Sequence, residues 1–95
     1  MFIIKLTYKV PLKEVDKHLN NHIEYLNIQY EQKNFLISGG KVPRTGGIII
    51  SSINDKSELL KIIEKDPFKV HNLADYEVVE FKPSKASKEF NFLLE

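Results

Sequence analysis

The chain has 95 residues, of which 42% are hydrophobic, enough for one domain with a single core. Its 14 basic and 13 acidic residues are spread along the whole chain, which leaves no electrostatic footprint for nucleic acid. The absence of cysteine excludes a disulfide framework, thiol catalysis and cysteine-based zinc sites. No apolar run is long enough to span a membrane, and the early charge at Lys5 is unlike a signal peptide. We therefore expect a cytoplasmic protein that binds neither nucleic acid nor membrane.

The first part of the chain predicts a strand, a long helix and a second strand. Residues 2–8 are rich in β-branched and aromatic side chains, which are typical of a strand. The hydrophobic period then becomes helical, and one helix is expected over residues 12–33. A short strand at residues 35–38 follows, and we expect Gly39 and Gly40 to stop it.

The second part predicts a strand, a helix and a strand, at residues 48–53, 58–65 and 75–81. Gly46 and Gly47 are expected to open the strand, after a connection longer than a tight hairpin turn. Asn54 or Asp55 is the expected N-cap of the helix. The helix should end at Asp66, because a residue before proline avoids helical angles.

This order of elements predicts a ferredoxin-like α+β fold, in which two helices cover one face of a four-stranded antiparallel sheet. We expect the helices to cover the more apolar set of the first strand, namely Phe2, Ile4, Leu6 and Tyr8. The other face should carry Ile3, Lys5 and Thr7, with partners such as Ser38, Ser51 or Glu77 on neighbouring strands. We expect half of this face to contact the second copy in a dimer and the other half to form a solvent-filled pocket. We expect residues 1–95 to form one domain. Its apolar tail, residues 83–95, is expected to dock on the domain or on a partner.

His22 and Asp66 are the candidate catalytic residues. His22 falls within a row of apolar residues on one helix face, so its imidazole should point toward the core. Asp66 lies at a helix end, from which a carboxylate can turn back toward the fold, and we predict that the two groups meet. A carboxylate on one nitrogen fixes the tautomer of the imidazole and strengthens the ring as a base. The alternatives are a core histidine bonded for packing and an aspartate that caps local backbone groups.

Ser38, Arg44 and Phe68 are the candidate substrate-binding residues. Ser38 could hold a substrate oxygen, and the planar guanidinium of Arg44 could clamp a carboxylate. Phe68 could form a pocket wall. The alternatives are an exposed hairpin arginine and a core phenylalanine.

His18 and His22 are four residues apart on one helix, a spacing that can hold a metal, with His71 as a further ligand. The glutamate of a zinc-protease helix is missing, so a metal-dependent protein is the weaker hypothesis. The glycine pairs do not have the spacing of a phosphate-binding loop. We expect no metal and no organic cofactor.

Several of these motifs together resemble the YciI-like family. They comprise His22 followed by Tyr25-Leu26, then Leu36 to Gly39, Pro43 to Gly47, Asp66-Pro67-Phe68, Leu73 to Val78 and Glu80-Phe81. The chain departs from the family pattern at Leu19, where many relatives have arginine, and at Gly40, where many have proline. The resemblance implies a dimer paired through its sheets, an active pair at His22 and Asp66, and lyase or isomerase chemistry on a small molecule.

Two functions follow as hypotheses. One is a cofactor-independent lyase or isomerase acting on a small molecule through His22 and Asp66. The other is a non-catalytic dimeric module that binds a small ligand in the same pocket. Both predict a homodimer.

Overall fold

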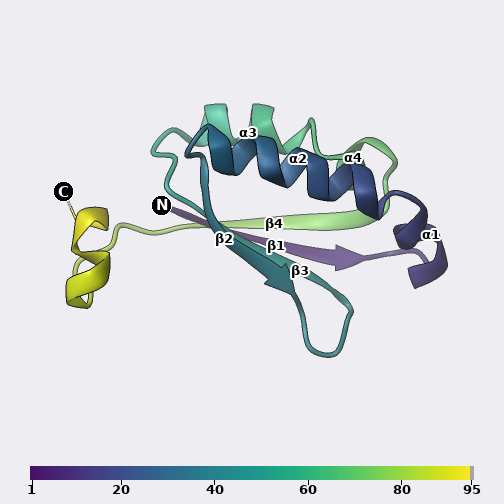
Figure 1. The fold of residues 1–95 in the computed structure, drawn as a ribbon, viewed down its shortest axis with the longest axis horizontal. Coiled ribbons are helices and arrows are strands. Elements are labelled where there is room, and N and C mark those ends of the chain that lie inside the picture. The colour runs from purple at the N-terminus through teal and green to yellow at the C-terminus, as the bar shows by residue number, and fades with distance from the viewer. Residues whose placement is uncertain (95) are drawn as a thin grey trace.

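A four-stranded antiparallel sheet covered on one face by the α-helices forms the body of the computed structural model, which describes residues 1–94 (Figure 1). The strands are β1 (Phe2–Tyr8), β2 (Phe35–Gly40), β3 (Gly46–Ser51) and β4 (Ala74–Glu80). Their order in the sheet is β2-β3-β1-β4, and every neighbouring pair is antiparallel. The predicted ferredoxin-like α+β fold is confirmed.

The helices differ from the prediction mainly in number. They are α1 (Leu12–Lys17), α2 (Leu19–Glu31), α3 (Lys56–Ile63), α4 (Pro67–Val70) and a 3-10 helix, η1 (Lys88–Leu93). The single helix expected over residues 12–33 is interrupted at His18, where φ is −112° and ψ is 5°. Of the two expected caps for α3, Asp55 is the one used, because its side chain accepts from the backbone N–H groups of Ser57 and Glu58. Helix α4 was not predicted.

The glycines lie inside the strands. Gly39 and Gly40 continue β2 rather than stopping it, and β3 begins at Gly46 and ends at Ser51, two residues before the predicted end. A Cβ at Gly46 would stand 1.8 Å from the carbonyl oxygen of Leu6, so this position requires glycine. A glycine therefore marks close approach of two strands here, and not a turn.

The helix-covered face of β1 is as predicted, with Phe2, Ile4 and Leu6 buried. The placement of Ser38 and Ser51 on the other face is wrong. Ser51 pairs with Phe2, and its side chain is buried on the helix side. Ser38 pairs with Ile49 on the same side, because the register of β2 shifts between Phe35 and Ile37, and one extra residue reverses the alternation of side chains.

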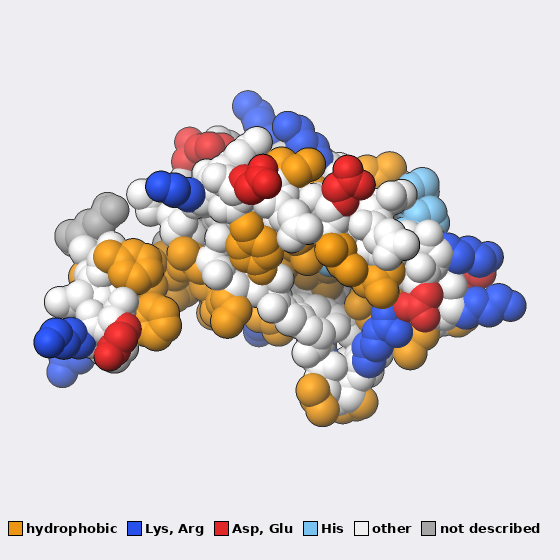
Figure 2. Space-filling model, viewed as in Figure 1, with side chains coloured by type: hydrophobic (Ala, Val, Ile, Leu, Met, Phe, Trp, Pro, Cys, Tyr) orange, Lys and Arg blue, Asp and Glu red, His pale blue; other side chains and the backbone are white. Residues whose placement is uncertain are grey.

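The open face of the sheet carries an aliphatic row that crosses all four strands. Register places Ile37, Ile50, Ile3 and Val79 side by side in this row. Lys5 and Glu77 pair beside it. Helix η1 follows an extended segment after β4, and hydrophobic side chains are exposed on it (Figure 2). Within residues 1–94, no helix has both the length and the apolar character needed to cross a membrane.

Candidate active site

His22 and Asp66 meet beneath helix α2. The Nδ1 atom of His22 lies 2.8 Å from Oδ1 of Asp66, across 44 positions of sequence. The Asp66 side chain is 1% exposed and the His22 side chain is 12% exposed. Because Asp66 engages Nδ1, a neutral His22 carries its proton there, and Nε2 is the nitrogen with a free lone pair.

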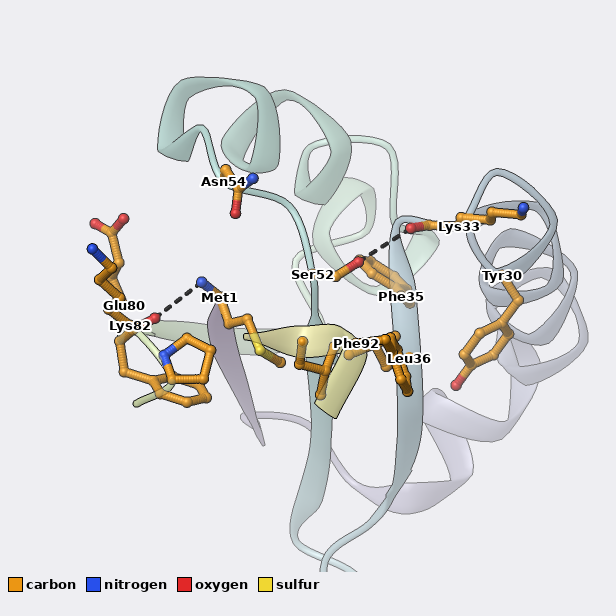
Figure 3. Close-up of a pocket in the computed structure, with 13 residues that line it drawn as sticks. Met1, Tyr30, Lys33, Phe35, Leu36, Ser52, Asn54, Glu80, Lys82 and Phe92 are labelled. Atoms are coloured by element: carbon orange, nitrogen blue, oxygen red, sulfur yellow. Dashed lines mark hydrogen bonds between the residues drawn. The ribbon is translucent and has the colours of Figure 1, made fainter. Parts of the chain in front are cut away.

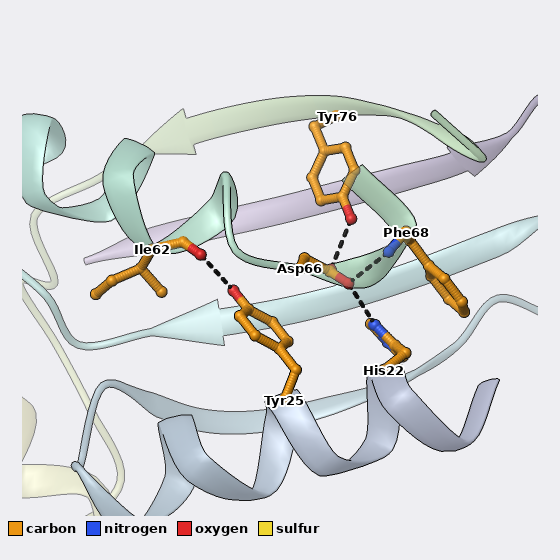
Figure 4. A network of polar contacts seen from close by, with 6 residues as sticks. All are labelled: His22, Tyr25, Ile62, Asp66, Phe68 and Tyr76. Atoms are coloured by element: carbon orange, nitrogen blue, oxygen red, sulfur yellow. Dashed lines mark hydrogen bonds and ion pairs between the residues drawn. The ribbon is translucent and has the colours of Figure 1, made fainter. Parts of the chain in front are cut away.

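Asp66 is held by two further donors (Figure 4). It is the N-cap of α4, since Pro67 starts that helix and the Asp66 carboxylate accepts from the backbone N–H of Phe68 at 3.0 Å. Its second oxygen accepts the hydroxyl of Tyr76, from β4, at 2.6 Å. Three donors from three elements thus compensate the desolvation of this buried carboxylate. The capping role expected as an alternative for Asp66 and its contact with His22 occur together.

The buried carboxylate affects the pKa values of two tyrosines. Burial, followed by the negative charge of Asp66, raises the pKa of Tyr76 and of Tyr25 far above the ordinary range. Both phenols therefore remain protonated donors. Tyr76 donates to Asp66, and Tyr25 donates to the backbone carbonyl of Ile62 at 2.9 Å.

Phe68 fixes the orientation of the His22 ring. Its ring stacks on that of His22, with centroids 3.9 Å apart and planes 7° apart. Phe68 is buried, and the ring of Tyr8 meets it edge-on. Asp66 therefore orients His22 within its plane and Phe68 supports one face of the ring.

A hollow of about 330 Å³ lies between α2 and the sheet, and His22 opens onto it. Four of the five predicted site residues line it, namely His22, Ser38, Arg44 and Phe68. Asp66 is not among the lining residues and lies behind His22. Apolar residues of α2 complete one wall. Leu6 and Tyr8 contribute to the rest, together with the backbone of Gly39, Gly40 and Gly47.

Ser38 and Arg44 both have partners within the protein. The Ser38 hydroxyl is hydrogen-bonded to that of Tyr30. Arg44 donates from Nη2 to Asp16 of α1 at 2.6 Å, and this hydrogen bond raises the pKa of the guanidinium further above its ordinary value. The contact ties the β2–β3 hairpin to α1 beside the hollow.

The other two histidines form a separate pair. His18 stacks on His71 with ring centroids 4.0 Å apart. Within residues 1–94, no three histidine, cysteine, aspartate or glutamate side chains are grouped so that they could hold a metal ion. The metal hypothesis based on His18 and His22 therefore gains no support from the geometry.

A larger hollow of about 850 Å³ lies at the opposite end of the sheet (Figure 3). Met1, Leu36 and Phe81 line its sheet side, and Phe92 and Leu93 of η1 face them. No member of the predicted site lies there. The hollow is instead where the tail approaches the domain.

Sequence reasoning missed Tyr76, Tyr8 and the pair Gly40 and Gly47 as parts of the site. The two-residue alternation of β4 could have placed Tyr76 on the helix side, since Ala74 and Val78 share that face. Its contact with Asp66 depends on α4, which was not predicted.

The sequence of the chain matches a known protein family. A model of the YCII-related domain matches residues 1–82. The chain belongs to this family. The predicted resemblance is confirmed, and residues 83–95 lie beyond the matched domain.

One solved structure with the same fold is a 5-chloro-2-hydroxyhydroquinone dehydrochlorinase from Burkholderia phenoliruptrix AC1100, in complex with 2,5-dihydroxybenzoquinone. Its TM-score to this chain is 0.72, with 19% sequence identity over 88% of this chain and 96% of that chain. No curated protein sequence matches the chain significantly.

Proposed function

We propose that this protein is a small-molecule enzyme of the lyase or isomerase type, with His22 as its acid and base. The supporting observation is that His22 is bonded through Nδ1 to the buried Asp66 while its ring lines the hollow. A histidine kept only for packing would be sealed among side chains. This one combines an orienting carboxylate with access to a ligand-sized space.

The chemistry follows from the tautomer. Asp66 accepts a hydrogen bond from Nδ1–H, so Nε2 can remove a proton from a hydroxyl or from a carbon next to a carbonyl. The electron pair left on the substrate forms a new double bond, and a leaving group departs with its bonding pair. In an isomerisation, Nε2 returns the proton to another atom. Asp66 stabilises the imidazolium that forms in either case.

Ser38, Arg44 and Phe68 are proposed to bind the substrate. An acidic oxygen on the substrate would attract Arg44, whose guanidinium has further donors besides the one that Asp16 accepts. The Ser38 hydroxyl can hold a second oxygen. Phe68 forms part of the wall of the hollow, and its ring also supports one face of the imidazole of His22.

The structurally similar dehydrochlorinase supports this reaction class, because loss of HCl from a hydroxylated ring is an elimination. We would therefore test the purified protein against 5-chloro-2-hydroxyhydroquinone and a panel of small hydroxy and keto acids. Chloride release and absorbance changes report conversion. We expect His22→Ala to abolish conversion and His71→Ala, which alters a histidine outside the hollow, to retain it.

Two results would count against this function. Unchanged conversion by a folded His22→Ala protein would remove His22 from the mechanism. Binding of compounds from the panel without any conversion would favour the non-catalytic module instead.

We further propose that the protein forms a homodimer through the open face of the sheet. The aliphatic row of Ile37, Ile50, Ile3 and Val79 leaves an apolar surface, and Ile37 is 61% exposed. We also propose that residues 83–95 dock on the domain or on the partner. Phe90 and Phe92 are exposed in the single chain, and docking would bury them. Light scattering at micromolar concentration should give a dimer mass for the wild type and a monomer mass for Ile37→Lys. Val70→Lys, an exposed position on α4, should remain dimeric.

A further inference from the structure

The hollow beside His22 exists because one row of the sheet lacks side chains. Two neighbouring rows face the helices. The first contains Ser38, Ile49, Ile4 and Val78, so each strand contributes a side chain. The second contains Gly40, Gly47, Leu6 and Tyr76. In this second row, β1 and β4 contribute the side chains of Leu6 and Tyr76, whereas β2 and β3 contribute no side chain.

The backbone does not require glycine at position 40. None of the glycines has a positive φ, and a Cβ at Gly40 would meet nothing closer than the carbonyl oxygen of Gly46 at 3.9 Å. Gly46, where a Cβ would stand 1.8 Å from a backbone oxygen, is the contrasting case. At Gly47 a Cβ would approach the carbonyl oxygen of Gly39 to 3.2 Å, which is tight but not prohibitive. Glycine at position 40 therefore leaves space rather than relieving strain.

That space belongs to the hollow. Gly40 and Gly47 line it together with His22 and with Leu19, Ile23 and Leu26 of α2. The floor is thus bare backbone, the opposite wall is aliphatic, and polar groups from His22, Ser38 and Arg44 are placed around the space. A volume of about 330 Å³ is at the lower end of the range of about 300–1,000 Å³ for small-molecule sites.

We propose that Gly40 is the specificity-determining position of this site, admitting a flat single-ring substrate with an acidic oxygen between the glycine floor and α2. This inference rests on the proposed function for its substrate class. Its steric part, that the missing side chain at position 40 keeps His22 accessible, stands independently. A larger residue at position 40 would occupy the space that a ring needs to reach Nε2.

The experiment compares Gly40→Leu with Gly39→Leu. The backbone of Gly39 borders the hollow, but Gly39 pairs with Ile48 in the row of Lys5, so a side chain at position 39 would point to the open face of the sheet, where a Cβ meets nothing within 4 Å. Diethyl pyrocarbonate acylates the unprotonated nitrogen of an imidazole, and tandem mass spectrometry assigns the modified histidine. We expect the modification rate of His22 to fall about tenfold in Gly40→Leu, since the leucine side chain would fill the part of the hollow beside the imidazole and leave no room for the reagent. It should stay unchanged in Gly39→Leu. His71 in each protein is the internal control.

The modification rate of His22 and the kinetics of the Gly40 variants test the proposal separately. Wild-type reactivity of His22 in a folded Gly40→Leu protein would overturn the proposal. If Gly40→Leu does not fold, Gly40→Ala should still slow the modification measurably, and no change there would also overturn it. Shielding of His22 without conversion of any panel compound by the wild type would retain the steric inference and reject the proposed reaction. In an active wild type, Gly40→Ala should raise KM for 5-chloro-2-hydroxyhydroquinone more than it lowers kcat, and an unchanged KM would reject the specificity role.

Discussion

Replacing Tyr76 by phenylalanine tests how strongly the buried carboxylate depends on its donors. The substitution removes one hydroxyl and leaves the ring. In the wild type this hydroxyl donates to Asp66 at 2.6 Å, and Asp66 is 1% exposed. The second carboxylate oxygen would then lose its donor within the protein.

The expected loss follows from the charge of the acceptor. A hydrogen bond to a charged group contributes about 1.5–3 kcal/mol, against about 0.5–1.5 kcal/mol for a neutral pair. Tyr76 is partly exposed, so water can replace part of the interaction. We therefore expect Tyr76→Phe to lower the free energy of unfolding by about 2 kcal/mol.

Tyr25→Phe is the matched control. Tyr25 also packs in the core and donates one hydrogen bond, but its acceptor is the neutral carbonyl of Ile62, which also accepts from the backbone N–H of Lys65. Its loss should cost about 1 kcal/mol or less. Urea unfolding at neutral pH measures both, and with m near 1.5 kcal/mol/M the Tyr76→Phe midpoint should fall by about 1.3 M.

Equal losses for the two variants would refute this reasoning. They would mean that Asp66 gains no more from its phenol donor than a backbone carbonyl does. An unchanged midpoint for Tyr76→Phe would have the same meaning.

Two further predictions concern backbone fit and charge. Gly46→Ala should lower the free energy of unfolding by roughly 3 kcal/mol, because its Cβ collides with the backbone of β1, whereas Gly39→Ala should be nearly neutral in the same urea assay. Hydrogen bonds from Ser57 hold the pKa of Asp55 below its ordinary value of 3.8. The stabilisation by this cap should therefore be complete above that pH and be lost as the pH falls through the lowered pKa. Melting curves of wild type and Asp55→Ala should differ at neutral pH and converge in strong acid, and a constant difference would contradict the assignment.

The sequence predicted the elements well where hydrophobic periodicity was clear, and less well where glycine was taken to mark the end of a strand. β1 was predicted with its observed bounds, and the remaining strands within a few residues. Gly39 and Gly40 have the composition of a turn but continue β2. Their role depends on the neighbouring strand, which local sequence does not specify.

The meeting of His22 with Asp66 could be predicted because each residue had a local signal, an apolar helix row for one and a proline-marked helix end for the other. The position of Ser38 could not, since the bulge in β2 reverses its face. Tyr76 was missed because its partner, Asp66, is the N-cap of a short helix that has no hydrophobic period of its own.

The burial of Asp66 itself favours function over packing. Removing a carboxylate from water costs several kcal/mol, and replacing buried ionic groups by apolar residues is often neutral or stabilising. Here the chain instead uses α2, α4 and β4 to supply donors to one carboxylate, and it leaves the hollow beside the bonded imidazole unfilled. Stability alone would be served better by filling that space, because a missing methylene already weakens a core. An oriented base next to an accessible hollow is the arrangement that proton transfer to a bound molecule requires.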